Sequence, residues 1–268
     1  MFRTLFKASE SFAMHGGSSM AACIAYYSLF SLAPLLIIAL SVAGIWFGTE
    51  TTSTNLVAQI EDFTGSTASL GGAIADILKS SKPPAGGALS LGLFLLFIGA
   101  SSVFHQIKDT LNIIWDATPI KRHPVHNYII GRLQSIATVV IFCILLAGAS
   151  IFSIYTAEWR EHSGLFWSIL LYVAAGLAFT LVFFLLFRLL ADHVLPVKSI
   201  LIASLLTSFL FLVGKFGISW YVKTVAISSG YGAASSLVVL LIWLYYSSMI
   251  FIFGAEFAFQ HSKKYKNL

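Results

Sequence analysis

Long apolar segments separated by short polar connections dominate the pattern of the chain. A helix needs about 20 apolar residues to cross a hydrocarbon core roughly 30 Å thick. The alternation typical of membrane β-strands is absent from the sequence. The pattern therefore predicts an all-α, polytopic membrane protein with six transmembrane helices. The predicted spans are 20–46, 88–107, 133–155, 165–190, 200–222 and 233–259.

Two segments outside these spans are amphipathic. In residues 1–19, apolar side chains recur at helical spacing, with Arg3 and Lys7 on the other side. This pattern predicts an interfacial helix on the cytoplasmic membrane surface. Residues 47–87 hold six charged side chains as well as Gly and Pro pairs, which predicts short amphipathic helices on the periplasmic face. Residues 1–268 are expected to form a single membrane domain.

Composition supports a membrane location. Charged residues make up 10% of the 268 residues and apolar residues 58%, and the mean hydropathy is +0.88. A soluble domain has about a quarter of its residues charged. The net charge is +5, and the basic residues cluster at the ends of apolar segments. That placement favours membrane lipids, with their anionic headgroups, as partners and argues against nucleic acid.

Loop charges predict the orientation. The connections at 121–132 and 188–198 and both ends of the chain are basic, whereas 47–87 and 156–164 carry more acid than base. Because positively charged connections stay inside, we expect a multi-pass protein of the bacterial cytoplasmic (inner) membrane with both termini cytoplasmic. An even number of spans agrees with this orientation. No signal peptide precedes the first apolar segment, which is expected to remain as an anchor.

Three stretches are more polar than a lipid-facing helix requires. In the first, residues 25–34, Tyr27, Ser31 and Pro34 share one helical face, next to Tyr26. A proline in mid-membrane frees a backbone carbonyl that neighbours or water must satisfy. The stretch fits either a kinked helix that lines a cavity or a kink packed against neighbours, with Tyr26 joining the helices.

The second stretch, residues 99–116, is polar on two adjacent faces. Its candidate cavity-lining residues are Ser102, His105, Gln106, Asp109 and Asn112. Uncompensated polar groups in lipid cost several kcal/mol each, so this helix lines a wet vestibule or emerges into the cytoplasm. His105 fits a proton relay, although an interface histidine is the favoured interpretation.

The third stretch, residues 231–256, leads to a carboxylate near the cytoplasmic end of the last span. Its candidate residues are Tyr231, Ser236, Trp243, Tyr246, Ser247 and Glu256. A membrane carboxylate is a functional candidate by default. The alternative, which we favour, is an interfacial acid that pairs with a basic residue of the tail or a loop.

The sequence carries no signature of an enzyme. It has no Gly-Lys-Ser/Thr phosphate loop, no Gly-x-Ser-x-Gly motif and no metal-ligand cluster. His123 and His126 have the spacing of metal ligands but no Cys or carboxylate nearby to complete a set. We therefore predict no catalytic residues, no metal and no cofactor. Cys23 and Cys143 lie in apolar runs and suit packing.

The three polar stretches resemble motifs of the YihY/BrkB family of bacterial inner-membrane proteins. The matching segments are AYYSLFSLAP at 25–34, GASSVFHQ at 99–106, LNIIW at 111–115, YGAASS at 231–236, WLYY at 243–246 and GAE at 254–256. Their order and spacing match across nearly the whole chain, although Ser235 stands where glycine is expected. The resemblance implies six helices with both termini cytoplasmic. It implies less about activity, because members have been labelled ribonuclease BN (a misassignment), virulence factors and exporters or lipid translocators.

The sequence and its resemblance to this family leave three candidate functions. The favoured one is an inner-membrane transporter, exporter or flippase-like protein for an amphipathic or lipid-like molecule. The alternative is a non-transporting scaffold for envelope maintenance or assembly. A membrane-bound ribonuclease is the least favoured. RNA hydrolysis needs metal-binding carboxylates or an acid/base pair, and the acids and histidines on the cytoplasmic side of this chain are few and scattered. A homo-oligomer is compatible with the sequence.

Overall fold

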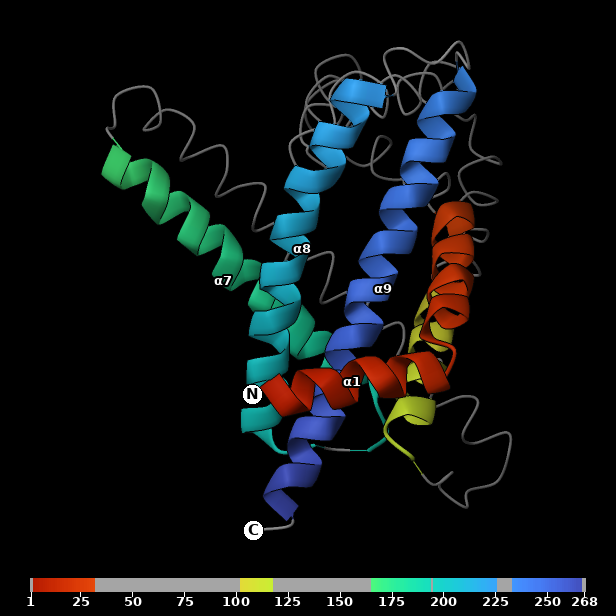
Figure 1. The fold of residues 1–268 in the computed structure, drawn as a ribbon, viewed down its shortest axis with the longest axis vertical. Coiled ribbons are helices and arrows are strands. Elements are labelled where there is room, and N and C mark those ends of the chain that lie inside the picture. The colour runs from red at the N-terminus through yellow and green to blue at the C-terminus, as the bar shows by residue number, and fades with distance from the viewer. Residues whose placement is uncertain (1, 32–101, 118–164, 194, 226–232, 267–268) are drawn as a thin grey trace, which may run out of the picture. The chain divides into compact units, whose positions relative to one another are not determined.

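The computed structural model describes residues 2–31, 102–117, 165–193, 195–225 and 233–266 (Figure 1). Throughout these residues the regular secondary structure is α-helix, which confirms the predicted all-α fold class. The helices are α1 (Phe2–Met14), a helix over 17–31, a helix over 102–114, α7 (Leu165–Leu190), α8 (Val197–Val225) and α9 (Ala233–Lys266).

Two of these helices are long and apolar enough to cross a membrane. The apolar windows are Val197–Ile218 of α8 and Val238–Lys263 of α9, and α7 has a shorter one over Gly176–Leu190. The side chains of Leu201, Leu205 and Phe209 are exposed, and their four-residue spacing places them on one face of α8. A row of exposed apolar side chains suits contact with hydrocarbon better than contact with water.

Several predicted segments lie outside the described residues. They are the span at 133–155, the periplasmic segment at 47–87 and most of the spans at 20–46 and 88–107. Helices α7, α8 and α9 overlap the last three predicted spans. The number of spans and the side of the membrane on which the termini lie stay predictions.

The chain divides into two compact units. Unit 1 comprises Met1–Gly17, Phe104–Leu210 and Ile250–Leu268. Unit 2 comprises Ser18–Val103 and Phe211–Met249. Helices α8 and α9 contribute residues to both units.

Aromatic side chains from three helices form the centre of unit 1. Phe187 of α7 stacks on Phe251 of α9 with ring centroids 4.9 Å apart, and Trp115 lies 6.3 Å from Phe187. All three side chains are buried. Aromatic pairs of this kind contribute about 0.5–1.5 kcal/mol beyond their burial. The cluster joins α7 and α9 to the end of the 102–114 helix.

Helices α8 and α9 approach closely at Gly254. A Cβ atom there would overlap Oγ1 of Thr207 on α8 and press on the ring of Phe187, 3.3 Å away. Only a residue without a side chain permits this spacing. The glycine of the GAE segment is therefore a packing requirement.

In unit 2, α8 and α9 meet through aromatic rings. Phe211 contacts Trp243 edge to face, with centroids 5.2 Å apart. A Cβ atom on Gly214 would overlap the ring of Tyr246. This second glycine lets a large aromatic side chain lie directly against the backbone of α8.

Candidate functional site

Glu256 of α9 is completely buried in unit 1, with an exposed fraction of 0%. Its neighbours Ala255, Phe257 and Ala258 are equally buried and apolar. Taking a carboxylate out of water costs several kcal/mol unless a partner compensates it. In these apolar surroundings, the stability of the buried carboxyl group depends on a hydrogen-bonding partner.

That partner is His15. Its Nδ1 atom lies 2.6 Å from Oε1 of Glu256, a short contact for a nitrogen and an oxygen. A proton must lie between the two atoms, donated either by the imidazole or by the carboxyl group. The side chain of His15 is 31% exposed, so it connects the buried acid with solvent. The other carboxyl oxygen, Oε2, has no hydrogen-bond partner in the described part of the chain.

The turn that ends α1 positions His15. Its backbone N–H donates to the carbonyl of Ser11 at 2.9 Å, and Gly16 follows with a φ of 65°. Glycine adopts this left-handed conformation without strain. A Cβ atom on Gly17 would overlap the ring of Phe12. The Gly16–Gly17 pair thus leads the chain into the 17–31 helix and leaves His15 at α9.

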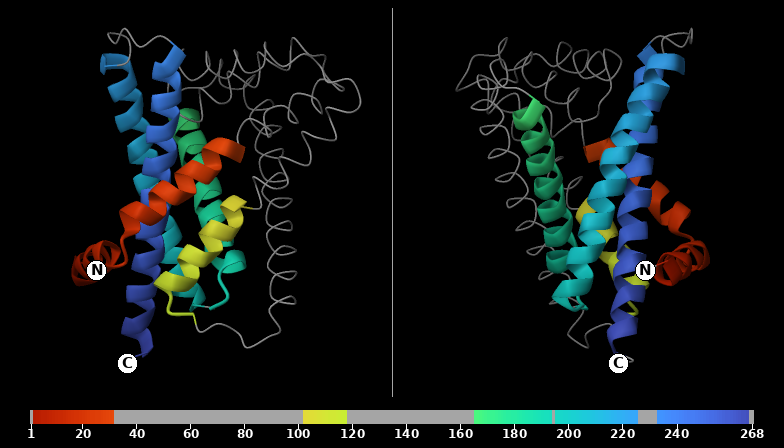
Figure 2. Two further views of the ribbon diagram at one scale, coloured as in Figure 1. Left: turned by 90° about the vertical axis from the view of Figure 1, so that its right-hand side faces the viewer. Right: turned by 60° about the vertical axis from the view of Figure 1, so that its left-hand side comes forward.

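Helix α1 lies across the C-terminal half of α9 (Figure 1), and Figure 2 shows it nearly end-on beside that half. Besides the His15 contact, Phe12 meets Phe253 edge to face with centroids 6.4 Å apart. Thr4, Ala8 and Ser11 are the buried side chains of α1, and their spacing puts small residues along its packed face. Small side chains let α1 lie close to the rest of unit 1.

A second polar cluster joins the 102–114 helix to the connection between α7 and α8. Lys108 Nζ lies 2.9 Å from Oδ1 of Asp192. Asn112 donates through Nδ2 to the other carboxylate oxygen at 2.9 Å, and its Oδ1 accepts the backbone N–H of Asp192 at 3.0 Å. Three contacts on one aspartate fix the position of this connection.

The end of the same helix is attached to α9. Trp115 Nε1 donates to the carbonyl of Ala255 at 3.0 Å. Asp116, with a φ of 48°, ends the helix and lies 3.7 Å from Nζ of Lys263. The ammonium group of Lys263 also lies 4.1 Å from the ring centroid of Phe259. Lys263 of the basic C-terminal segment therefore pairs with Asp116 and not with Glu256.

The partner of Glu256 is His15, in the turn that follows α1, and not a residue of the basic tail. The carboxyl group is buried in protein, and its depth in the membrane stays a prediction. Sequence inspection missed His15 and Asp192. The one available signal was a polar residue directly before Gly16–Gly17, between the amphipathic helix and the first span.

The other candidates of unit 1 lie nearer the surface. His105 is exposed and contacts Asp109, one turn later on its own helix, at 3.4 Å. An exposed pair of this kind adds little stability, and the interface interpretation of His105 stays a prediction. Gln106 is half-buried, and Asn112 belongs to the Asp192 cluster.

The described candidates of unit 2 differ in exposure. Tyr26 and Tyr27 are exposed, and Trp243 is buried. Ser102 and Tyr246 are half-buried, and the hydroxyl of Ser31 donates to the carbonyl of Ser28 at 3.0 Å. The buried hydroxyl of Ser247 has no partner among the described residues. Pro34, Tyr231 and the side chain of Ser236 lie outside the described part, and cavity lining stays a prediction for the whole set.

Comparison with known proteins gives a family and several relatives. Residues 8–268 match the family model described as virulence factor BrkB. A UPF0761 membrane protein of Alkalilimnicola ehrlichii is 30% identical over 250 residues, which are 88% of this chain and 53% of that protein. A UPF0761 membrane protein of Saccharophagus degradans is 27% identical, over 96% of this chain and 58% of its own length. The chain thus spans little more than half of these two relatives.

The Bacillus subtilis protein YfkH, whose name calls it ribonuclease-like only provisionally, is 27% identical over 267 residues. The alignment covers 94% of this chain and 93% of YfkH. No solved structure matches the chain. Its apolar helices agree with the membrane-protein names of the relatives, and the family model covers all but the first seven residues. The chain is therefore a membrane protein that belongs to the BrkB virulence factor family.

Proposed function

We propose that this protein is a transporter, exporter or flippase-like protein of the bacterial inner membrane that moves an amphipathic or lipid-like molecule. We further propose that the proton shared by His15 and Glu256 is coupled to its cycle. The single observation that supports the proposal most is the buried carboxyl group of Glu256, joined over 2.6 Å to a histidine that solvent reaches.

The pair couples a proton to a movement of α1. While His15 stays in place, its hydrogen bond compensates the buried carboxyl group of Glu256. If α1 moved away, an ionised Glu256 would be left uncompensated, at a cost of several kcal/mol. Moving α1 thus requires Glu256 to take the proton, and returning α1 lets the pair share it again. Ionisable residues in membrane helices commonly serve as proton relays of this kind.

An exposed aromatic cluster in unit 2 supports the amphipathic nature of the substrate. Tyr26 lies 4.7 Å from Phe30 and 5.7 Å from Tyr27, measured between ring centroids. All three side chains are exposed, Tyr26 by 56%. Phenol rings offer both apolar faces and a hydroxyl group, so they suit a molecule that has apolar and polar parts.

The test is translocation by the purified protein in liposomes, with fluorescent lipids and amphipathic solutes as probes. Wild-type protein should move at least one probe faster than empty liposomes do, and an imposed proton gradient should change that rate. Glu256→Gln cannot ionise and should reduce translocation by about tenfold.

Glu10→Gln is the matched control, because it removes an exposed carboxylate from α1. It should leave the rate unchanged. Wild-type rates equal to those of empty liposomes for every probe would overturn the transport proposal. Transport that is unaffected by Glu256→Gln would overturn the role of the proton.

A further inference from the structure

Helix α1 has three distinct faces rather than the two that its amphipathic pattern suggests. The first, with Thr4, Ala8 and Ser11, is buried. The second carries Phe2 and Phe6, which are 85% and 66% exposed. The third carries the exposed Arg3 and Lys7 along with Glu10. At 100° per residue, the phenylalanines lie opposite the buried face, and the charged face lies about a quarter turn to one side of them. A helix that packs on protein along its buried face can therefore turn Phe2 and Phe6 toward lipid and keep Arg3 and Lys7 beside them at the lipid–water boundary.

Three basic side chains of unit 1 have no carboxylate partner among the residues that the structure describes. Arg3, Lys7 and Lys198, at the start of α8, form no ion pair with any described residue. Lys263 differs, because Asp116 and the Phe259 ring already engage it. Within the described part of the chain, Arg3 and Lys7, on the same helix as the phenylalanines, and Lys198, at the start of α8, are therefore positive charges without an ion pair.

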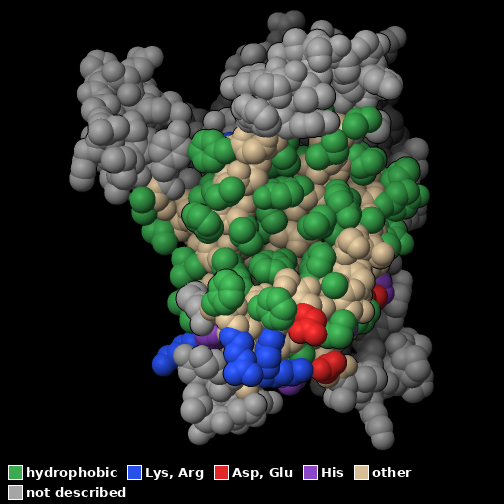
Figure 3. Space-filling model, in the orientation of Figure 1, with side chains coloured by type: hydrophobic (Ala, Val, Ile, Leu, Met, Phe, Trp, Pro, Cys, Tyr) green, Lys and Arg blue, Asp and Glu red, His purple; other side chains and the backbone are tan. Residues whose placement is uncertain are grey.

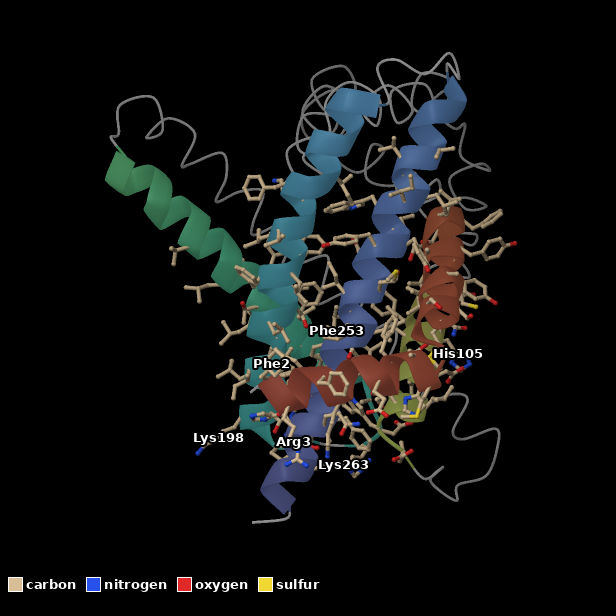
Figure 4. All side chains as sticks on the ribbon, in the orientation of Figure 1. Phe2, Arg3, His105, Lys198, Phe253 and Lys263 are labelled. Atoms are coloured by element: carbon tan, nitrogen blue, oxygen red, sulfur yellow. The ribbon has the colours of Figure 1, made fainter. Side chains whose placement is uncertain are left out.

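These charges lie toward the same end of unit 1. In Figure 4, Phe2 and Arg3 of α1 and Lys198 at the start of α8 all lie toward the end at which α9 finishes. In the space-filling view, Lys and Arg side chains form a patch beside apolar side chains (Figure 3). We call Phe2, Arg3, Phe6, Lys7 and Lys198 the basic–aromatic rim. The phenylalanines of the rim could contact the acyl chains of a phospholipid while its basic side chains contact the phosphate.

We propose that the basic–aromatic rim binds anionic phospholipids of the adjacent leaflet, with phosphates at the basic side chains and acyl chains along Phe2 and Phe6. Charge complementarity identifies the occupant, because unpaired Lys and Arg at a membrane surface attract anionic headgroups. The aromatic side chains favour a lipid over a soluble phosphate, since only a lipid covers them. This lipid site does not depend on the proposed transport function.

The test measures lipid binding by the full chain in a neutral detergent. Phosphatidylglycerol and phosphatidylcholine with identical acyl chains are titrated separately, and binding is followed by native mass spectrometry and by the shift in Tm. Phosphatidylglycerol should bind more tightly and raise the Tm further, and added salt should reduce this preference. Inorganic phosphate and glycerol phosphate should not compete.

Substitutions locate the site. The triple variant Arg3→Gln, Lys7→Gln, Lys198→Gln should weaken phosphatidylglycerol binding by about a hundredfold and phosphatidylcholine binding little. Phe2→Ser with Phe6→Ser should weaken binding of both lipids. Lys7→Arg should preserve the preference. Lys215→Gln, seventeen residues beyond Lys198 on α8, is the charge-matched control and should also preserve it.

Four results would overturn the proposal. One is equal binding of the two lipids by the wild type, and another is a preference that survives the triple variant. The third is competition by soluble phosphate, which would assign the rim to a soluble anion. The fourth is a dimer that dissociates on Phe2→Ser with Phe6→Ser while lipid preference is absent, which would assign the exposed phenylalanines to a second copy of the chain. The salt titration of the wild type tests the electrostatic part without any variant.

Discussion

Nδ1 of His15 lies 2.6 Å from Oε1 of Glu256, 241 positions later in the chain, and this contact joins α1 to the buried part of α9. His15→Ala should lower the free energy of unfolding by about 2–4 kcal/mol, because it leaves a buried carboxyl group without its partner. Denaturant unfolding in detergent measures the loss. The double variant with Glu256→Gln should lose less than the sum of the single changes. Strict additivity would contradict a direct interaction.

Gly254→Ala should destabilise the protein by about 1–3 kcal/mol, because the new methyl group overlaps Thr207 Oγ1. Thermal unfolding measures this change, and Thr207→Ala in the same chain should restore much of the loss. Gly217→Ala is the control, since a Cβ atom there meets nothing within 4 Å. It should be neutral or stabilising through better helix propensity. Equal effects at the two glycines would show that close packing is not the cause.

Asp192→Ala should cost about 1–3 kcal/mol, because it removes the acceptor of Lys108 and of the Asn112 amide. Limited proteolysis should detect loosening of the connection between α7 and α8. Asp109→Ala removes only an exposed contact with His105 and should change stability by less than about 0.5 kcal/mol. Similar losses for the two variants would argue against a structural role for the Asp192 cluster.

Tyr26→Ala should weaken the apparent affinity for a transported probe by about fivefold, through the loss of one aromatic contact of about 1 kcal/mol. Its Tm should stay close to that of the wild type, because the side chain is 56% exposed. Concentration-dependent uptake into liposomes gives the affinity. A variant with normal transport would exclude the aromatic cluster from the substrate path.

Local sequence pattern predicted the helices well. Helix α7 spans the predicted range 165–190, and α1 forms where amphipathic spacing placed a helix. Periodicity reports which positions share a face, but not what each face meets. The apolar side chains of α1 consequently divide between protein and surface: Phe12 packs on Phe253, while Phe2 and Phe6 are exposed.

The candidate site was predictable only in part. Glu256 stood out because a carboxylate is rare in an apolar helix, and in the structure it is buried and paired with His15. Its partner could not be found from spacing, because His15 reaches it through tertiary packing across almost the whole chain. Asp192 escaped for the same reason, since its partners lie on the 102–114 helix, 80 residues away in the case of Asn112.

The hydrogen bond from Trp115 to the carbonyl of Ala255 has a consequence for motion within unit 1. An indole wedged against one peptide group fixes the axial register of two neighbouring helices. A piston-like slide of α9 past the 102–114 helix would break this bond, and it would also pull Phe251 of α9 away from Phe187 of α7. Movement of the two helices together would keep the bond from Trp115 to Ala255. The C-terminal half of α9 and Trp115 at the end of the 102–114 helix should therefore move as one rigid body.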